Sequence, residues 1–460
     1  MMVVRAILNR LTAVTLWVAA PVLVAMSFNL YEPYLASVRS RLTVAIPLVC
    51  GVVLLLLWLR RNWIERTVAR RRIARLLLVV LWCLPPVGML QSQAVFQGDK
   101  RAVLGADQAA IARLGRHFIV GYSRMDAVAP LASKGLIGGI YVTHHNIRGR
   151  TADDLKAEIA GLQALRHAAG LPPLIVVADQ EGGIVSHLAP QLTALPALAT
   201  LADLPADVRA AKARDYGATH GRELAGIGVT INLAPVVDLR RAQQRNVLDF
   251  NSLIRWRAIS DDPAVVTEIA ANYIRGLNAA NVGATIKHFP GLGRARDDTH
   301  HFTARIDTPV EELEASDWRP FRDLLTGSNA HLMVGHAAVT AVDPDIPASH
   351  SKRLVDGLIR GTWGYQGLVM TDDMVMGAVY QHGICNSTVA SLNAGVDLLL
   401  VAFDGAQYYR IFNCALAASR RGELDEAMLT KSEARLKRLP SIAPAVAESS
   451  SSDERSDIRD

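Results

Sequence analysis

Long and nearly charge-free hydrophobic runs occupy the first hundred residues of the chain. Residues 11–31 and 42–59 are each long enough to cross a bilayer, which takes about 20 apolar residues. A third run, 76–98, is strongly apolar only to about Leu90 and is the weakest of the three. The pattern predicts a membrane region over residues 1–98 with about three transmembrane helices.

A different pattern starts near residue 103, where short β-rich apolar runs alternate with segments of helical periodicity. Eight strands alternating with helices over residues 103–438 predict an α/β fold, a (β/α)8 barrel of the TIM type. An open, doubly wound sheet is the main rival. The chain has no G-x-G-x-x-G after its first strand and no G-x-x-x-x-G-K-[ST], which disfavours nucleotide-binding versions of that rival. We expect the strands at 118–122, 138–143, 174–178, 229–236, 282–286, 331–335, 368–371 and 396–402.

The clearest helix is predicted over residues 151–169. Thr151 is a suitable cap, and apolar side chains recur on one face at Leu155, Ile159, Leu162 and Leu165. Further helices are expected at 204–226, 262–280, 309–326, 351–362 and 405–421. Residues 440–460 are polar and of low complexity, which predicts a disordered tail.

The net charge of +6 is unevenly distributed along the chain. Residues 1–100 carry nine net positive charges, and the rest of the chain carries three net negative ones. The basic balance therefore belongs to the membrane region and does not indicate nucleic-acid binding. Seven arginines separate the second and third hydrophobic runs: Arg60, Arg61, Arg66, Arg70, Arg71, Arg72 and Arg75.

The positive-inside rule places that arginine-rich loop in the cytoplasm. Three spans then put everything after residue 98 on the outer side of a bacterial inner membrane, whereas a third segment that only lies on the surface would leave it in the cytoplasm. We favour three spans. A cleaved signal peptide is disfavoured because the first apolar run is long and others follow it.

Two of the four cysteines, Cys50 and Cys83, fall in apolar runs. Cys385 and Cys414 lie in the remainder of the chain without metal-ligand spacing. They would pair in an oxidising compartment, but the sequence favours two small buried hydrophobic residues.

Polar residues follow the predicted strands one after another. Because the carboxyl ends of barrel strands meet at one rim, where barrel enzymes build their sites, these residues are expected to converge. They are Asp179, Gln180, Glu181, Asp238, Lys287, His288, His336, Asp372, Asp373 and Asp404.

Glycoside cleavage needs one group that attacks or stabilises the oxocarbenium-like centre and another that protonates the leaving oxygen. Histidine suits the second task because its ordinary pKa is about 6.5, and an adjacent carboxylate fixes its tautomer. Asp298 and His300 form such a pair. Gly291 and Gly293 permit sharp turns in the same loop. We therefore expect His300 to lie above a pocket that has Lys287 and His288 at its base.

Several segments in order resemble glycoside hydrolase family 3, in the branch of bacterial β-N-acetylhexosaminidases. The resemblance covers residues 115–405, about the whole region outside the hydrophobic runs and the tail. The segments are DQEGG at 179–183, NLAPVVDL at 232–239, NSLIRWR at 251–257, KHFPGLG at 287–293 with DDTH at 297–300, the nucleophile segment at 347–379, and LNAGVDLLLV at 392–401.

The resemblance implies retaining hydrolysis of a terminal β-linked N-acetylglucosamine, with peptidoglycan fragments as the usual substrates and with no metal or cofactor. It implies Asp372 as nucleophile, His300 as general acid/base and Asp298 as its partner. The residues that would hold the sugar are Asp179, Arg257, Lys287 and His288.

Three positions depart from the family pattern, which places arginine at two of them and histidine at the third. The chain has Ile184 and His187 where the family has arginine, and Leu292 where the family has histidine. These departures leave open a β-glycosidase with another sugar preference. A barrel that binds glycans without cleaving them is the alternative from another class.

Two rival assignments concern single residues. Asp373, next to Asp372, is the other candidate nucleophile. A zinc cluster of His288, Asp298, His300 and His301 is disfavoured because its spacings fit no common ligand motif.

Overall fold

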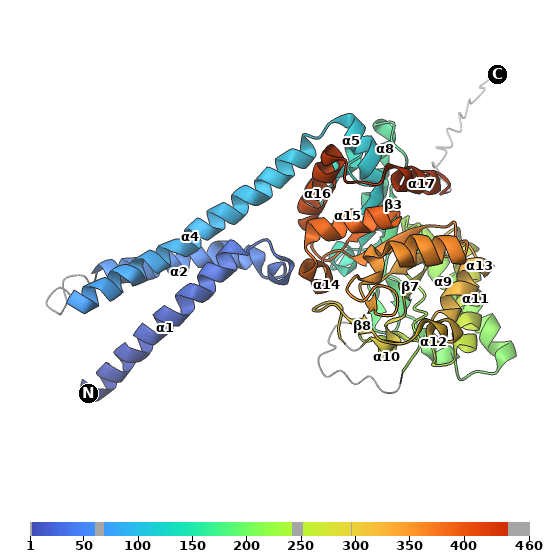
Figure 1. The fold of residues 1–460 in the computed structure, drawn as a ribbon, viewed down its shortest axis with the longest axis horizontal. Helices are drawn as coiled ribbons and strands as arrows, with labels where there is room; N and C mark the ends of the chain where they lie inside the picture. Colours follow the sequence, from blue (N-terminus) through green and yellow to red (C-terminus); the bar gives the residue numbers. More distant parts are fainter. Residues whose placement is uncertain (1, 60–68, 242–251, 296, 440–460) are drawn as a thin grey trace, which may run out of the picture.

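Eight parallel strands close into a barrel in the computed structural model, which describes residues 2–59, 69–241, 252–295 and 297–439 (Figure 1). Each strand pairs with its neighbour along the chain, and the last pairs with the first. The predicted (β/α)8 fold is confirmed, and the open sheet is excluded by this closure. The strands are β1 (Phe118–Gly121), β2 (Gly139–Val142), β3 (Ile175–Ala178), β6 (Ile231–Asn232), β7 (Gly283–Phe289), β9 (His331–Val334), β11 (Val369–Asp373) and β12 (Leu398–Val401).

Apolar side chains fill both faces of the barrel strands, which explains why the strands are continuous hydrophobic runs. In β1, Ile119 belongs to the core inside the barrel, whereas Phe118 and Val120 pack in the core between the strands and the helices. Parallel pairing of Ile119 with Gly139 and of Val120 with Val401 fixes the register of β1.

The helix predicted over 151–169 is α8 (Ala152–Ala168). The Thr151 hydroxyl accepts a hydrogen bond from the Asp154 backbone N–H at 3.1 Å, and the Asp154 carboxylate accepts one from the Thr151 N–H at 2.8 Å. This capping box satisfies two of the free N–H groups at the helix start. Of the predicted apolar face, only Leu165 is exposed.

The other predicted helices are α9 (Ala206–Ile227), α11 (Pro263–Asn278) and α16 (Gln407–Arg421), while 351–362 forms a π-type helix, η6 (Arg353–Thr362). The stretch 309–326 is two helices, α12 (Val310–Ala315) and α13 (Arg319–Gly327). Pro320 lies in the first turn of α13, where proline starts a helix readily and disfavours continuation from the preceding turn. Unpredicted helices include α5 (Gln108–Leu114), α6 (Met125–Ser133), α15 (Ile384–Ala394) and α17 (Glu426–Lys437).

Three long helices extend from one side of the barrel: α1 (Met2–Phe28), α2 (Arg39–Leu59) and α4 (Ala69–Leu104) (Figure 1). By length and composition, Arg39–Leu59 and Ile73–Leu104 can cross a membrane, and Val14–Phe28 is a shorter apolar helical segment. The third hydrophobic run, expected to be the weakest span, is thus part of the longest helix. The number of spans stays a prediction. Arg60, Arg61, Arg66, Asn251 and the expected tail at 440–460 lie outside the described residues.

A disulfide joins Cys385 in α15 to Cys414 in α16, with Cα atoms 5.0 Å apart. The favoured interpretation, two unpaired buried residues, was wrong. Cys385 lies at the exposed surface of α15, and only Cys414 is buried. Packing of α15 on α16 brings together two thiols that are 29 positions apart, which spacing alone does not reveal.

Candidate active site

Lys287 lies at the centre of the carboxyl-end rim, near the end of β7, and its side chain is buried. Its ammonium binds the Asp179 carboxylate and lies 2.6 Å from Glu181 Oε1. Burial lowers the pKa of Lys287, but the two carboxylates outweigh burial and raise it. Lys287 is therefore a fixed positive charge at neutral pH.

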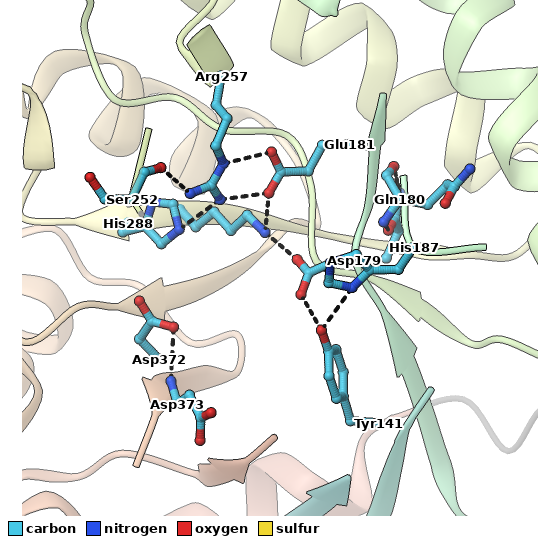
Figure 2. Close-up of polar contacts among 12 residues, drawn as sticks. Tyr141, Asp179, Gln180, Glu181, His187, Ser252, Arg257, His288, Asp372 and Asp373 are labelled. Atoms are coloured by element: carbon cyan, nitrogen blue, oxygen red, sulfur yellow. Dashed lines mark hydrogen bonds and ion pairs between the residues drawn. The ribbon is translucent and has the colours of Figure 1, made fainter. Parts of the chain in front are cut away.

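Glu181, in β4 (Gln180–Gly182), joins Lys287 to Arg257, which ends α10 (Ile254–Arg257). Two bonds link the carboxylate and guanidinium, Oε1 to Nη2 at 2.6 Å and Oε2 to Nε at 2.9 Å (Figure 2). Burial raises the pKa of Glu181, yet Arg257 and Lys287 hold it well below its usual range. The sequence predicts Glu181 at the rim but gives it no role, because its two partners come from distant parts of the chain.

His288 is oriented by Asp238, a fully buried carboxylate that follows β6. The ring Nδ1 lies 2.7 Å from Asp238 Oδ2, and the Leu292 backbone N–H donates to Oδ1 at 2.6 Å. The other ring nitrogen, Nε2, lies 3.2 Å from Arg257 Nη2 (Figure 2). One buried aspartate therefore fixes both the imidazole and the start of the following loop.

Of the two glycines in that loop, Gly291 has the expected task in a sharp turn, whereas Gly293 has a different one. Gly291 has a φ of +99°, a conformation that L side chains rarely adopt. A Cβ on Gly293 would lie 2.1 Å from the carbonyl oxygen of Leu239. Glycine is thus required at one position for conformation and at the other for close approach.

Asp298 and His300 form the predicted pair. His300 Nδ1 lies 2.8 Å from Asp298 Oδ1, and the His300 backbone N–H donates to the same oxygen at 2.9 Å. The Asp298 carboxylate is buried, whereas the His300 side chain is 38% exposed and so accessible to a ligand. Burial lowers the pKa of the imidazole, but the bond to Asp298 and the charge of Asp372 raise it above its usual value.

Asp372 and Asp373 end β11 and have different surroundings. The Asp373 carboxylate accepts three backbone N–H bonds, from Val375 at 3.1 Å, Ala402 at 2.9 Å and Phe403 at 2.8 Å. It ties the end of β11 to the end of β12, and burial raises its pKa to about 6. These contacts give Asp373 a structural task.

The Asp372 carboxylate accepts a bond from the Asp373 backbone N–H at 2.8 Å (Figure 2). Burial raises the pKa of Asp372, but the imidazoles of His288, His336 and His300 lower it below the usual value. Asp372 is therefore ionised at neutral pH. It is near enough to His300 for each charge to favour the ionised form of the other.

A tyrosine that sequence reasoning missed, Tyr141, connects Asp179 with one of the family departures. Its hydroxyl donates to Asp179 Oδ2 at 2.8 Å and lies 3.1 Å from His187 Nδ1 (Figure 2). Ile184 is exposed on the same side of the barrel, whereas Leu292 is buried. Two of the three departures thus lie at the accessible rim.

All seven predicted site residues lie at the carboxyl-end rim, where contacts and charges connect them. Contacts join Asp179, Lys287, Arg257 and His288 through Glu181, and a separate contact joins Asp298 to His300. The charge of Asp372 interacts with both His288 and His300. In the part of the chain that the structure describes, no three His, Cys, Asp or Glu side chains form a group that could hold a metal ion.

Comparisons with family models, curated proteins and solved structures identify the same family. Residues 105–439 match the glycosyl hydrolase family 3 N terminal domain. A β-hexosaminidase of Xanthomonas campestris pv. campestris is 34% identical over 269 residues, covering 58% of this chain and 77% of that protein. One from Stenotrophomonas maltophilia is 35% identical over 270 residues, covering 58% and 76%.

Solved structures support the same family assignment. A family 3 β-N-acetylglucosaminidase from Paenibacillus sp. str. FPU-7 superposes with a TM-score of 0.64 at 29% identity, covering 71% of this chain. This chain spans 61% of that protein's length. A family 3 glycosyl hydrolase from Mycobacterium smegmatis superposes with a TM-score of 0.62 at 30% identity, covering 73% of this chain and 97% of that one. The chain therefore belongs to glycoside hydrolase family 3 and is an enzyme that cleaves O-glycosyl bonds.

Proposed function

We propose that the protein is a retaining β-N-acetylhexosaminidase that releases terminal N-acetylglucosamine from peptidoglycan-derived glycans. Asp372 attacks the anomeric carbon, and His300 protonates the leaving oxygen. His300 then takes a proton from the water that hydrolyses the glycosyl-enzyme. Asp298 holds the imidazole and stabilises its charged form.

The observation that supports this mechanism most is the pairing of an ionised Asp372 with an imidazole whose pKa is raised. A nucleophile has to be charged and an acid has to carry its proton before the first step; the lowered pKa of Asp372 and the raised pKa of His300 favour these two states. A barrel that only binds glycans has no need of an accessible histidine held by a buried carboxylate at 2.8 Å.

The sugar is held by the group around Lys287. Asp179 is partly exposed and accepts from both Lys287 and Tyr141, so its position is fixed and it can accept bonds from sugar hydroxyls. Specificity for N-acetylglucosamine is supported by the β-N-acetylglucosaminidase and β-hexosaminidase names of the relatives. His187 in place of an arginine favours, as the second candidate, a β-glycosidase with another sugar preference.

The N-terminal helices anchor the enzyme in a bacterial inner membrane, with the barrel on the outer side. Two helices of sufficient length, together with the arginine-rich segment between them, support this orientation. The disulfide between Cys385 and Cys414 supports it independently, because disulfides persist in oxidising compartments and are rare in the cytosol.

An assay with matched variants tests the activity. The wild-type enzyme should hydrolyse a chromogenic β-N-acetylglucosaminide faster than the corresponding glucoside. Asp372→Asn should abolish turnover while the melting temperature stays close to that of wild type, since the substitution is isosteric. Equal turnover by Asp372→Asn would refute the mechanism, and preference for the glucoside would refute the assigned sugar.

A further inference from the structure

The connection between α1 and α2 (residues 29–38), the start of α2 and the end of α4 dock directly on the barrel. Arg39 binds Asp404, which follows β12, through Nη2 to Oδ2 at 2.5 Å and Nη1 to Oδ1 at 3.0 Å. Glu32 pairs with Arg410 at 2.9 Å, and Asn413 donates to Asp99 at 2.8 Å. We call these three pairs the clasp.

Aromatic packing reinforces the clasp. The rings of Tyr31 and Phe96 stack with centroids 4.2 Å apart, and Phe96 meets Tyr409 of α16 edge-on at 5.7 Å. Gln407 donates to the Tyr31 carbonyl and accepts from the Tyr380 hydroxyl at 2.8 Å. Since the Arg39 and Asp404 side chains are 14% and 7% exposed, this is a packed junction instead of a loose tether.

The clasp lies at the end of the lipid-facing part of the helices. Exposed apolar side chains on the helices extend to Phe28 in α1 and to Val95 in α4. Asp99 follows Val95 by four residues, which in a helix is about 6 Å. The clasp therefore holds the barrel close to the level where the bilayer would end.

The clasp also lies on the catalytic side of the barrel. Asp404 follows Phe403, whose backbone N–H donates to the Asp373 carboxylate, next to Asp372. Figure 1 shows the α1–α2 end of the helices beside α14 (Gly377–Gln381), which follows β11. The loops at the carboxyl ends of the strands, which form the active-site mouth, are thus the ones nearest the helices.

Exposed apolar side chains gather at this same mouth. Among the described residues after Leu104, large apolar side chains that are exposed lie mostly in loops that follow barrel strands. We call this set the apolar rim: Ile184, Trp256, Phe302, Ile346 and Phe403, exposed by 59%, 57%, 52%, 44% and 65%. Leu165 and Val208, on helices α8 and α9, are the exceptions.

Their chemistry fits a membrane surface. The guanidinium of Arg255, an exposed residue, lies 4.5 Å from the Trp256 ring, and tryptophan with arginine is a combination enriched where lipid headgroups meet the hydrocarbon. A soluble glycan can stack on aromatic rings, but it offers few contacts for exposed isoleucines such as Ile184 and Ile346. A bilayer surface, or the lipid portion of an amphiphilic substrate, offers many.

We propose that the active-site mouth faces the bilayer surface and that the substrate is a glycan carried on a lipid. This inference rests on the proposed membrane anchoring and hydrolase activity. The clasp sets the distance and the tilt of the barrel, and the apolar rim contacts the lipid beside the glycosidic bond. A sugar attached to a membrane lipid then reaches Asp372 and His300 without leaving the surface.

The test uses the full-length enzyme in vesicles of phosphatidylethanolamine and phosphatidylglycerol. Two substrates are compared: a soluble fluorogenic β-N-acetylglucosaminide, and a β-N-acetylglucosaminide of a long-chain alcohol embedded in the same vesicles. The rim variant is Ile346→Ser with Phe403→Ser. Leu165→Ser, which removes an exposed apolar side chain near the end of α8, on the amino-end side of the barrel and so away from the mouth, is the matched control.

We expect the rim variant to lower kcat/KM for the embedded substrate about tenfold and to leave the soluble substrate unchanged, because two side chains that contact lipid are lost. Leu165→Ser should change neither rate. A rim variant with the same ratio of the two rates as wild type would overturn the proposal, as would a wild-type enzyme that cleaves only the soluble substrate. Failure of wild type to cleave either substrate would refute the proposed hydrolase activity instead.

The clasp supplies a second variant. Arg39→Ala should lower the rate on the embedded substrate and not on the soluble one, since it frees the barrel from its fixed tilt while the site residues stay in place. Equal loss on both substrates would mean that Arg39 supports the fold of the site and would count against the proposed orientation. Melting temperatures of all the variants identify any that misfold.

Discussion

His300 Nδ1 lies 2.8 Å from Asp298 Oδ1, while the rest of the imidazole is accessible at the mouth of the barrel. The carboxylate is buried and also accepts the His300 backbone N–H at 2.9 Å. These two bonds fix the ring orientation and leave Nε2 as the nitrogen that can exchange a proton with a ligand.

Asp298→Ala should lower kcat/KM by about 100-fold, because a positioned general acid contributes rate enhancements of this order or more. Asp298→Asn should retain part of the activity, since the amide oxygen can still accept from Nδ1. Steady-state kinetics of the two variants provide the measurement. Full activity in Asp298→Ala would show that the pair has no catalytic task.

The pH dependence of the wild-type enzyme follows from the two shifted groups. Activity requires ionised Asp372 and protonated His300. The acid limb of kcat/KM should lie below the ordinary aspartate pKa of 3.8, and the alkaline limb above the ordinary histidine pKa of 6.5. In Asp298→Ala the alkaline limb should move to lower pH, because the bond that raises the pKa of His300 is gone. If the alkaline limb did not move in this variant, a group other than His300 would be responsible for it.

Glu181→Gln should lower the free energy of unfolding by about 3 kcal/mol at pH 7, because it leaves the buried Lys287 and Arg257 without their shared carboxylate. Since the folded pKa of Glu181 is below its ordinary 4.5, the wild type gains this stabilisation above pH 4.5 and loses it as the pH falls further. The difference in the free energy of unfolding between the variant and wild type should therefore become smaller at acid pH. Chemical denaturation at several pH values measures it, and a constant gap would contradict this account.

Cys385→Ser combined with Cys414→Ser should lower the free energy of unfolding by about 3 kcal/mol, the value typical for a closed loop of this size. A reducing agent should lower the melting temperature of wild type and leave the double variant unchanged. Identical melting temperatures of wild type with and without reductant would show that the bond is not formed in the protein.

The fold was predictable because strand and helix signals alternate along the chain and each element is local. The Asp298–His300 pair was predictable for the same reason, since two positions separate the partners. Contacts that depend on barrel closure were not predictable from the sequence. Lys287 reaches Asp179 across 108 positions, and nothing near either residue reveals that Glu181 joins Lys287 to Arg257.

The docking of the N-terminal helices was equally hidden. Arg39 and Asp404 are 365 positions apart, and although the sequence predicts Asp404 at the rim, nothing near either residue indicates that the two pair. The π-type turns at 353–362 and the exposed Cys385 were missed because periodicity reports burial on a helix face and says little about hydrogen-bond type or about a neighbouring helix.

The assignment of Asp372 as nucleophile is the central claim, and covalent trapping tests it most directly. A fluorinated N-acetylglucosaminide that reacts quickly and hydrolyses slowly is incubated with the enzyme, which is then digested for mass spectrometry. We predict a single added sugar on the peptide that contains Asp372, with the modification on that carboxylate and no label in Asp372→Asn. Label on Asp373, or an enzyme that turns over substrate without ever carrying the sugar, would contradict the account.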